Sequence, residues 1–338
     1  MYCPKIIRKK HIRNLLLFPA FCVLMHTGTL SAFAADPLCT YTGFYFDTVI
    51  SISLYDTDDQ DILDECDELM KGYENTLSRT LEGSEIWQIN HSGGKPVTVS
   101  ETTADLIRTA LTYCELSEGA FDITIAPVID LWDFHQENDP VPPDPQAVSE
   151  ALSHVGYEKI KLTGNEVTLT DPKSGIDLGA IAKGFISDGV KELLLSRGVK
   201  SAMINLGGNV MTIGEKPDGS LWKIGIREPF APSASDLAAV VPVDDQSVIT
   251  SGTYERYFLF DNHLYHHILD PSTGYSYENG LTSVTILSVS GTAGDALSTT
   301  CFALGLEKGL ELIENTPDTE ALFITEDRKQ YTSSGWPG

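Results

Sequence analysis

The order of hydrophobic and polar residues predicts strands and helices along most of the chain. Apolar residues alternate with mostly polar or small ones over 44–54, which predicts a β-strand. Apolar positions recur every three or four residues over 63–77 and 104–114, which predicts two helices, the second with Ser100 as its N-cap. A further helix is predicted from about Ile181 to Arg197, followed by a glycine that stops it.

Short apolar runs predict several more strands, and the overall order of elements indicates the fold class. The strands are expected around Ile160, Val167, 203–206, 222–226 and 248–250. Four prolines within 138–145 predict a surface loop. Strands and helices do not follow a regular β–α–β repeat, so we expect an α+β fold in which helices pack on mixed or antiparallel sheets.

The N-terminal segment has the features of a secretory signal. Five basic residues precede an apolar run at 15–25 that is too short to span a bilayer comfortably, and Ser31-Ala32-Phe33-Ala34 supplies small residues at a cleavage site. We therefore predict a signal peptide over 1–35, cleaved after Ala34, and an exported mature domain over 36–338. An uncleaved membrane anchor is the alternative.

Charge and cysteine content limit the possible partners. The chain carries a net charge of −25, and the first 35 residues hold five basic and no acidic residues, so the mature chain carries 18 basic against 48 acidic residues, or −30. Such a surface repels nucleic acid and anionic membranes, and an anionic ligand would need a cation or a local basic group. The four mature cysteines lack metal-site spacing, so we expect buried free thiols, with disulfides as the alternative for an exported chain.

The segment 266–280, HHILDPSTGYSYENG, combines two histidines with a rigid turn. Pro271 fixes its own φ, and Gly274 can take the positive φ of a tight reversal. In an extended segment His266 and His267 point to opposite faces, one to a cavity and one to solvent. The pattern alone does not decide which of them, if either, is a proton acceptor.

A second candidate lies in 294–305, GDALSTTCFALG. Asp295 and Thr299 are four residues apart on a predicted helix, so one helix face presents two oxygen ligands suited to a hard cation. A proton acceptor near a magnesium-type site indicates phosphoryl chemistry.

Three further segments carry weaker indications. Gly119-Ala120-Phe121-Asp122 suits contact with a planar ring, and its alternative is a turn into a core strand with Asp122 capping backbone donors. The segment 177–184, DLGAIAKG, suits phosphate binding at a helix start, and its alternative is an ordinary helix capped near Asp177. Ser251 lacks a nucleophile elbow, so serine catalysis is not supported.

Taken in order, seven segments resemble the ApbE family of FAD:protein FMN transferases over roughly residues 40–330. They are SEIWQIN (84–90), GAFDITIAPVIDLW (119–132), DLGAIAKG (177–184), INLGGN (204–209), SVITSGTYERYF (247–258), HILDPSTG (267–274) and DALSTTCFALG (295–305).

The resemblance implies a role for twelve residues. The FAD contacts it implies are Phe46, Thr80, Ala120, Phe121, Asp122, Asp177, Lys183 and Ile268. It implies Mg²⁺ ligation by the side chains of Asp295 and Thr299 and by the backbone oxygen of Ala180, and it makes His267 the general base. The chain departs from the family at Phe46, where Met is usual, at Thr80, where others have an aromatic residue, and at 131–135, LWDFH in place of LWGFG.

The resemblance also implies a reaction. It is the Mg²⁺-dependent transfer of FMN from FAD to a Thr or Ser hydroxyl of an acceptor protein, with release of AMP, in a site between two halves of the fold. The implied acceptor is a membrane-bound redox subunit on the extracytoplasmic side. The alternatives are a pyrophosphatase that splits FAD with water and a flavin-binding protein without turnover.

Overall fold

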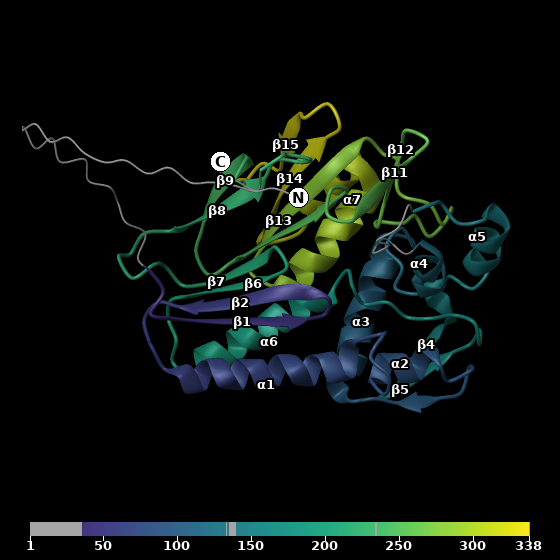
Figure 1. The fold of residues 1–338 in the computed structure, drawn as a ribbon, viewed down its shortest axis with the longest axis horizontal. Helices are drawn as coiled ribbons and strands as arrows, with labels where there is room; N and C mark the ends of the chain where they lie inside the picture. Colours follow the sequence, from purple (N-terminus) through teal and green to yellow (C-terminus); the bar gives the residue numbers. More distant parts are fainter. Residues whose placement is uncertain (1–35, 133, 135–139, 234, 338) are drawn as a thin grey trace, which may run out of the picture. The chain divides into compact units, whose positions relative to one another are not determined.

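The computed structural model describes residues 36–132, 134, 140–233 and 235–337, and these residues form one compact unit. Within them, eight strands form an antiparallel sheet in the order β1-β2-β6-β7-β10-β13-β14-β15 (Figure 1). The strands are β1 (Cys39–Tyr45), β2 (Thr48–Leu54), β6 (Ala202–Leu206), β7 (Asn209–Ile213), β10 (Ser247–Gly252), β13 (Leu281–Ser288), β14 (Thr319–Thr325) and β15 (Gln330–Thr332). The α+β fold with antiparallel sheets is confirmed, whereas the predicted signal peptide lies outside the described residues.

The strand predicted over 44–54 is in fact a hairpin of β1 and β2. Phe46 and Asp47 form its two-residue turn, with φ values of 52° and 56°, and Tyr45 pairs with Thr48. Positive φ at both turn positions is the geometry that joins antiparallel strands tightly, and it is usually signalled by Asn-Gly. The sequence lacks that signal, and the apolar alternation continues through the turn, so the pattern gave a single strand.

Helices α1 (Gln60–Leu77), α6 (Ala182–Ser196) and α7 (Gly291–Glu314) cover one face of this sheet. Leu63 and Met70 of α1 are fully buried with Ile52 of β2, as the three-and-four spacing predicted. The helix predicted from Ile181 to Arg197 is α6, and Gly198 follows it with a φ of 82°. Strands β8 (Trp222–Arg227) and β9 (Leu237–Val243) pair as a two-stranded ribbon. Their buried side chains form a separate apolar cluster together with residues of β10, β13 and β14.

A second layer contains α2 (Glu85–Asn90), α3 (Glu101–Leu116) and a three-stranded sheet (Figure 1). The sheet has the order β3 (Val97–Thr98), β5 (Glu166–Leu169), β4 (Ile160–Thr163), and a short 3₁₀ turn, η1 (Tyr157–Lys159), precedes β4. Ser100 caps α3, because its side chain accepts a hydrogen bond from the Thr103 N–H, as predicted. One core cluster joins this layer to Ala296 of α7.

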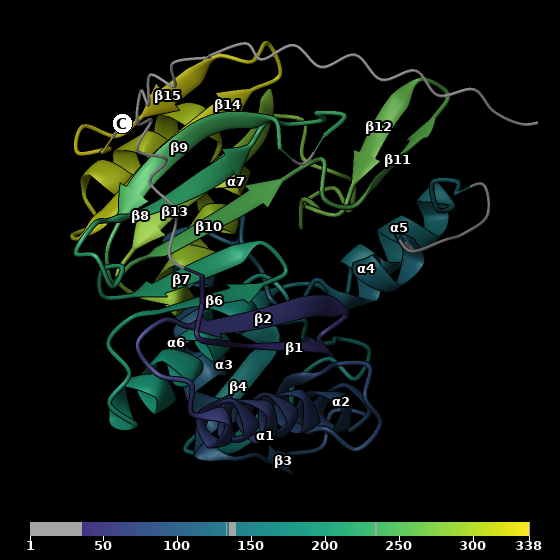
Figure 2. The same ribbon diagram turned by 60° about the vertical axis from the view of Figure 1, so that its left-hand side comes forward.

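A third group consists of α4 (Ala126–Trp132), α5 (Pro145–Leu152) and the hairpin of β11 (Tyr257–Phe260) and β12 (His263–His266) (Figure 2). The apolar run after Asp122, whose alternative interpretation was a core strand, forms α4 instead, because Val128 and Trp132 are four apart and share a buried helix face. Pro145 occupies the first turn of α5, where a missing N–H costs nothing, so the predicted proline-rich loop ends there. Residues 138 and 139 of that loop lie outside the described residues.

Two further observations concern cysteines and membranes. All four cysteines in the described residues are free; Cys66, Cys114 and Cys301 are buried as expected, whereas Cys39 is only half-buried. In the part of the chain that the structure describes, no helix combines the length and apolarity needed to cross a bilayer.

Candidate functional site

A cavity of about 770 Å³ lies where the three groups of elements meet. It is bordered by the β1–β2 turn, the end of α1, the segments before α4 and α6, the β6–β7 turn, the end of β10, the segment after β12 and the start of α7. All twelve residues singled out from the sequence line it: Phe46, Thr80, Ala120, Phe121, Asp122, Asp177, Ala180, Lys183, His267, Ile268, Asp295 and Thr299. Residues far apart in the chain therefore meet at one cavity.

Asp295 is a residue of α7, and its side chain is buried against the N-terminus of α6. Its Oδ2 accepts a hydrogen bond from the Gly184 N–H (2.9 Å), and its Oδ1 accepts one from the Asn209 side-chain amide (2.8 Å). The positive end of α6, which the sequence suggested for a phosphate, thus holds a carboxylate of the protein itself. A Cβ on Gly184 would lie 2.0 Å from the Gly291 carbonyl oxygen, so glycine is required here for α6 to approach α7.

The bond from Gly184 to Asp295 has a consequence for Ala180. In a continuous helix the Gly184 N–H would donate to the Ala180 carbonyl, but α6 begins only at Ala182 and this N–H is taken by Asp295. Among the described residues no donor reaches the Ala180 oxygen. The carbonyl that the resemblance assigned to the metal is therefore left without a hydrogen-bond partner, and Ala180 lines the same cavity as Asp295.

Thr299 completes the set of oxygen donors. It lies one turn after Asp295 on α7, and its hydroxyl is 3.0 Å from the Ser251 hydroxyl. In the described residues no group of three or more His, Cys, Asp or Glu side chains is placed to hold a metal. One carboxylate, one hydroxyl and one free carbonyl are hard donors, and Mg²⁺ is commonly bound by one or two carboxylates plus substrate phosphates. The donor set fits Mg²⁺ and does not fit zinc.

Asp177 is not the cap of α6, contrary to the alternative interpretation of its segment. The N-cap position is Ile181, which makes no side-chain cap bond. Asp177 instead forms an ion pair with Arg79 (2.6 Å), and Arg79 also pairs with Asp130 (2.6 Å). Arg79 lines the cavity but was missed by the sequence analysis, because no local pattern marks a long-range ion pair.

Lys183 supplies a positive charge beside the proposed metal ligands. Its ammonium group lies 3.7 Å from Asp295 Oδ1 and donates to the Gly179 carbonyl at 3.0 Å. Arg256 also lines the cavity and is a second basic residue that the sequence analysis missed. These cations lower the electrostatic cost of an anionic ligand in a strongly acidic protein.

Asp122 is buried and largely satisfied by the protein. It accepts hydrogen bonds from the Thr124 N–H (2.7 Å) and hydroxyl (2.6 Å) and from the Tyr157 N–H (2.9 Å). Burial raises the pKa of its carboxyl group. These bonds agree with the capping alternative for Asp122, and they make this carboxylate a rigid part of the cavity wall.

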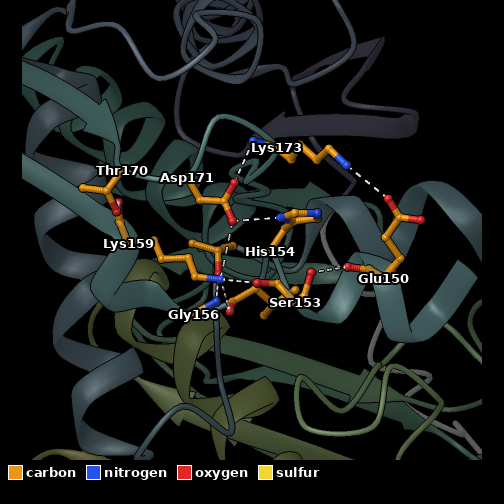
Figure 3. Close-up of polar contacts among 10 residues, drawn as sticks. Glu150, Ser153, His154, Gly156, Lys159, Thr170, Asp171 and Lys173 are labelled. Carbon is orange, nitrogen blue, oxygen red and sulfur yellow. Dashed lines mark hydrogen bonds and ion pairs between the residues drawn. The ribbon is translucent and has the colours of Figure 1, made fainter.

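A polar network also fixes the loop at 153–157, whose Tyr157 N–H is bonded to Asp122 (Figure 3). His154 Nδ1 lies 2.8 Å from an Asp171 carboxylate oxygen, and the Lys159 ammonium donates to the Ser153 carbonyl at 2.6 Å. The Gly156 N–H donates to the Thr124 hydroxyl at 2.7 Å. The loop at 153–157 is therefore fixed from both sides, which stabilises the wall formed by Asp122.

The two histidines differ sharply, and neither faces open solvent as the extended pattern had suggested for one of them. His266 is buried, with Nε2 3.0 Å from the Tyr277 carbonyl and Nδ1 3.3 Å from the Ile268 N–H, so it has a structural role. His267 lines the cavity, and its Nδ1 is buried without a hydrogen-bond partner in the described residues. Burial, together with the positive charge of Arg256, lowers the pKa of His267 to about 3, so its imidazole is neutral.

The DPSTG turn that follows His267 is itself held in place. The Gly274 N–H donates to the Asp270 carbonyl at 2.7 Å with a Gly274 φ of 74°, as the sequence predicted. The indole of Trp132 donates to the Gly274 carbonyl at 2.8 Å, which fixes the turn to α4. The remaining sequence-derived positions, Phe46, Thr80 and Ile268, lie around the cavity wall. Asp133 and His135 of the LWDFH segment lie outside the described residues.

The site combines features that together define a class of protein. One cavity, large enough for a nucleotide, is lined by a neutral imidazole, a buried carboxylate, a hydroxyl group, a backbone carbonyl and the basic side chains of Arg79, Lys183 and Arg256. This arrangement suits an enzyme that acts on an anionic ligand of nucleotide size.

Comparison with known proteins narrows this class. The sequence matches the ApbE family over residues 46–323. It is 39% identical over 298 residues to a FAD:protein FMN transferase of Klebsiella pneumoniae, covering 87% of this chain and 92% of that protein. It is 36% identical over 289 residues to a FAD:protein FMN transferase of Treponema pallidum, covering 81% of this chain and 79% of that protein.

Solved structures give the same result. The ApbE protein of Thermotoga maritima has a TM-score of 0.79 at 32% identity, and the flavin transferase ApbE of Vibrio cholerae has a TM-score of 0.78 at 30% identity. Each alignment covers 88% of this chain and 97% of the other. The chain therefore belongs to the ApbE family of FAD:protein FMN transferases.

Proposed function

We propose that this enzyme transfers the FMN moiety of FAD to a Thr or Ser hydroxyl of an acceptor protein, depends on Mg²⁺, and releases AMP. The observation that carries the proposal is the meeting of His267, Asp295, Thr299 and Lys183 in one cavity. A proton acceptor, oxygen donors for a hard cation and a fixed positive charge are what displacement at a pyrophosphate requires.

Asp295, Thr299 and the Ala180 carbonyl would hold Mg²⁺. When bound, Mg²⁺ neutralises negative charge on the pyrophosphate of FAD. The Gly184 N–H and the Asn209 amide orient the Asp295 carboxylate by binding Oδ2 and Oδ1. Lys183 places a positive charge 3.7 Å from Oδ1. The protein thus fixes the donors before the ligand arrives, which avoids reorganisation during the reaction.

His267 would take the proton from the acceptor hydroxyl. The hydroxyl oxygen forms a bond to the FMN-side phosphorus, the bond from that phosphorus to the bridging oxygen breaks, and AMP leaves with the bridging oxygen. The low pKa of His267 makes it a weak base in the free protein. The negative charge of bound FAD raises that pKa, so the imidazole becomes a stronger base when the substrate is present.

One incubation separates transfer from its alternatives. The protein is mixed with FAD, Mg²⁺ and a displayed peptide library in which a fixed threonine is flanked by randomised residues. A gain of FMN mass on library peptides supports the proposal. Free FMN and AMP without peptide modification would indicate a pyrophosphatase, and unchanged FAD would indicate a binding protein. His267→Gln is the matched control, because glutamine keeps a polar side chain but does not act as a general base.

We also propose that the protein works outside the cytoplasm, on an acceptor such as a membrane-bound redox subunit whose modified hydroxyl faces the same side. The basic segment, short apolar run and Ser31-Ala32-Phe33-Ala34 support export. N-terminal sequencing of the protein from its native host is the test. A chain that begins near Ala35 agrees with the proposal, and a cytosolic chain that begins at Met1 contradicts it.

A further inference from the structure

The hairpin of β11 and β12 has an open edge beside the cavity that the proposed reaction does not use. We propose that the acceptor polypeptide binds in an extended conformation as an added strand along β11 and thereby delivers its hydroxyl group to His267. The inference rests on the proposed function, because it requires a protein acceptor.

The pairing of the hairpin shows which backbone groups are free. The His267 N–H donates to the Arg256 carbonyl, and Tyr257 pairs with His266 in the next position of the ladder. Because hydrogen-bonded and non-hydrogen-bonded pairs alternate in an antiparallel ladder, the N–H and C=O groups of Tyr257 and Leu259 point away from β12. In the part of the chain that the structure describes, β11 pairs with no strand other than β12.

The opposite edge of the hairpin is partly occupied. The His266 N–H donates to the Ser276 hydroxyl at 2.7 Å, and that hydroxyl donates to the His266 carbonyl at 2.6 Å. These bonds agree with the alternation, since His266 is the non-hydrogen-bonded partner of Tyr257. The edge of β11 is therefore the more accessible of the two near the cavity.

The side chains along β11 favour a polypeptide partner. Tyr257 is 43% exposed and Leu259 is 66% exposed, and the ring of Phe230, itself 40% exposed, packs edge-on against Tyr257 at 5.2 Å. Exposed apolar residues on a free strand edge are a liability in a protein with no partner for them. An added strand gains its affinity from main-chain hydrogen bonds and its specificity from alternate side chains.

The other face of the hairpin is held rigidly. Phe258 is buried and stacks on Tyr265 at 5.3 Å, and both rings contact Trp132 of α4. The β11 edge is thus anchored to the same α4 that fixes the DPSTG turn. A preformed edge lowers the ordering cost of binding.

The edge is continuous with the cavity, and this decides the occupant. Glu255 and Arg256 line the cavity and lead directly into Tyr257, and the backbone of Arg256 is bonded to that of His267. A strand that follows β11 past Arg256 enters the cavity beside His267. This is where the reaction needs a protein hydroxyl, so we assign the edge to the acceptor and not to a second copy of this chain.

Leu259→Pro and Leu264→Pro form a matched pair of variants. The two residues are cross-strand partners, and the N–H of each points away from the hairpin, so neither substitution removes a ladder hydrogen bond. Proline at 259 removes an edge donor and fills the edge with its ring, whereas proline at 264 does the same on the opposite side.

The readout is kcat/KM for a peptide selected from the threonine library with the unmodified protein, together with the affinity for FAD. We expect Leu259→Pro to lower kcat/KM about tenfold or more and to leave the affinity for FAD unchanged. We expect Leu264→Pro to change kcat/KM less than about twofold. Equal losses in the two variants, or no loss in Leu259→Pro, would overturn the assignment. A dimer that Leu259→Pro dissociates would give the edge to a second copy instead.

A scan of the peptide needs no variant of the enzyme. Methylation of successive backbone nitrogens of the selected peptide should lower kcat/KM at alternate positions only, because every second N–H of an added strand faces β11. A loss without alternation contradicts strand addition. If the unmodified protein modifies no library peptide at all, the proposed function itself fails and this inference falls with it.

Discussion

Replacement of His266 by glutamine should remove a pH-dependent component of stability. The neutral imidazole donates from Nε2 to the Tyr277 carbonyl and accepts at Nδ1 from the Ile268 N–H, at 3.0 and 3.3 Å. A protonated ring has two donors and no acceptor, so it cannot keep the second bond. Burial accordingly lowers the pKa of His266 from 6.5 to about 4. A glutamine amide can donate and accept in the same way but does not titrate.

The sign and size of the effect follow from linkage. Because the folded-state pKa lies below the unfolded one, the unfolded chain binds the proton first, and stability is lost as the pH falls from 6.5 toward 4. At about 1.4 kcal/mol per pKa unit, the shift of His266 corresponds to about 3 kcal/mol at the acid limit. At neutral pH we expect His266→Gln to be less stable by about 1 kcal/mol, since it loses the packing of the ring against Phe302.

Urea denaturation of both proteins between about pH 7 and about pH 4.5 provides the measurement. The stability advantage of the unmodified protein should shrink on acidification and reverse at about pH 6, where the loss from protonation reaches about 1 kcal/mol. Other titrating groups are shared by the two proteins, so their contributions cancel in the difference. A difference that stays constant across this range would refute the assignment of His266 as a buried neutral residue.

Three further variants test the site. Asp295→Asn should abolish transfer at limiting Mg²⁺, because it removes the single carboxylate of the donor set, and wild-type activity under those conditions would contradict the metal assignment. His267→Ala should slow transfer about 10²–10⁴-fold with FAD binding retained, as measured by single-turnover kinetics; weaker FAD binding with unchanged turnover would make it a binding residue. Arg79→Gln should weaken FAD binding about tenfold in equilibrium titration, since it releases Asp177 and leaves two carboxylates unpaired, and unchanged affinity would show that the ion pair is only structural.

Regular elements were predictable where one face of the element is buried. The apolar spacing of α1 and the cap of α3 are local properties, and both are confirmed. The turn at Phe46 and Asp47 was not predictable, since neither residue is typical of a positive-φ hairpin and the alternation runs through it. The apolar run that became α4 was ambiguous because short apolar runs suit strands and helices equally well.

For the candidate site too, the sequence predicted what local spacing determines and missed what tertiary packing determines. Asp295 and Thr299 were found because they share one helix face, which is a property of local spacing. Asn209, Arg79 and Arg256 were missed because their contacts are set by tertiary packing between distant segments. The choice between His266 and His267 also depended on tertiary structure, since the segment at 276–277 covers one of the two faces.

The most direct test of the central claim is mass spectrometry of the acceptor after a single turnover with FAD labelled in its adenine ring. The account predicts that FMN is attached through a phosphoester to a Thr or Ser side chain, that the acceptor carries no adenine label, and that one labelled AMP appears per FMN attached. Labelled AMP accompanied by free FMN and an unmodified acceptor would contradict it.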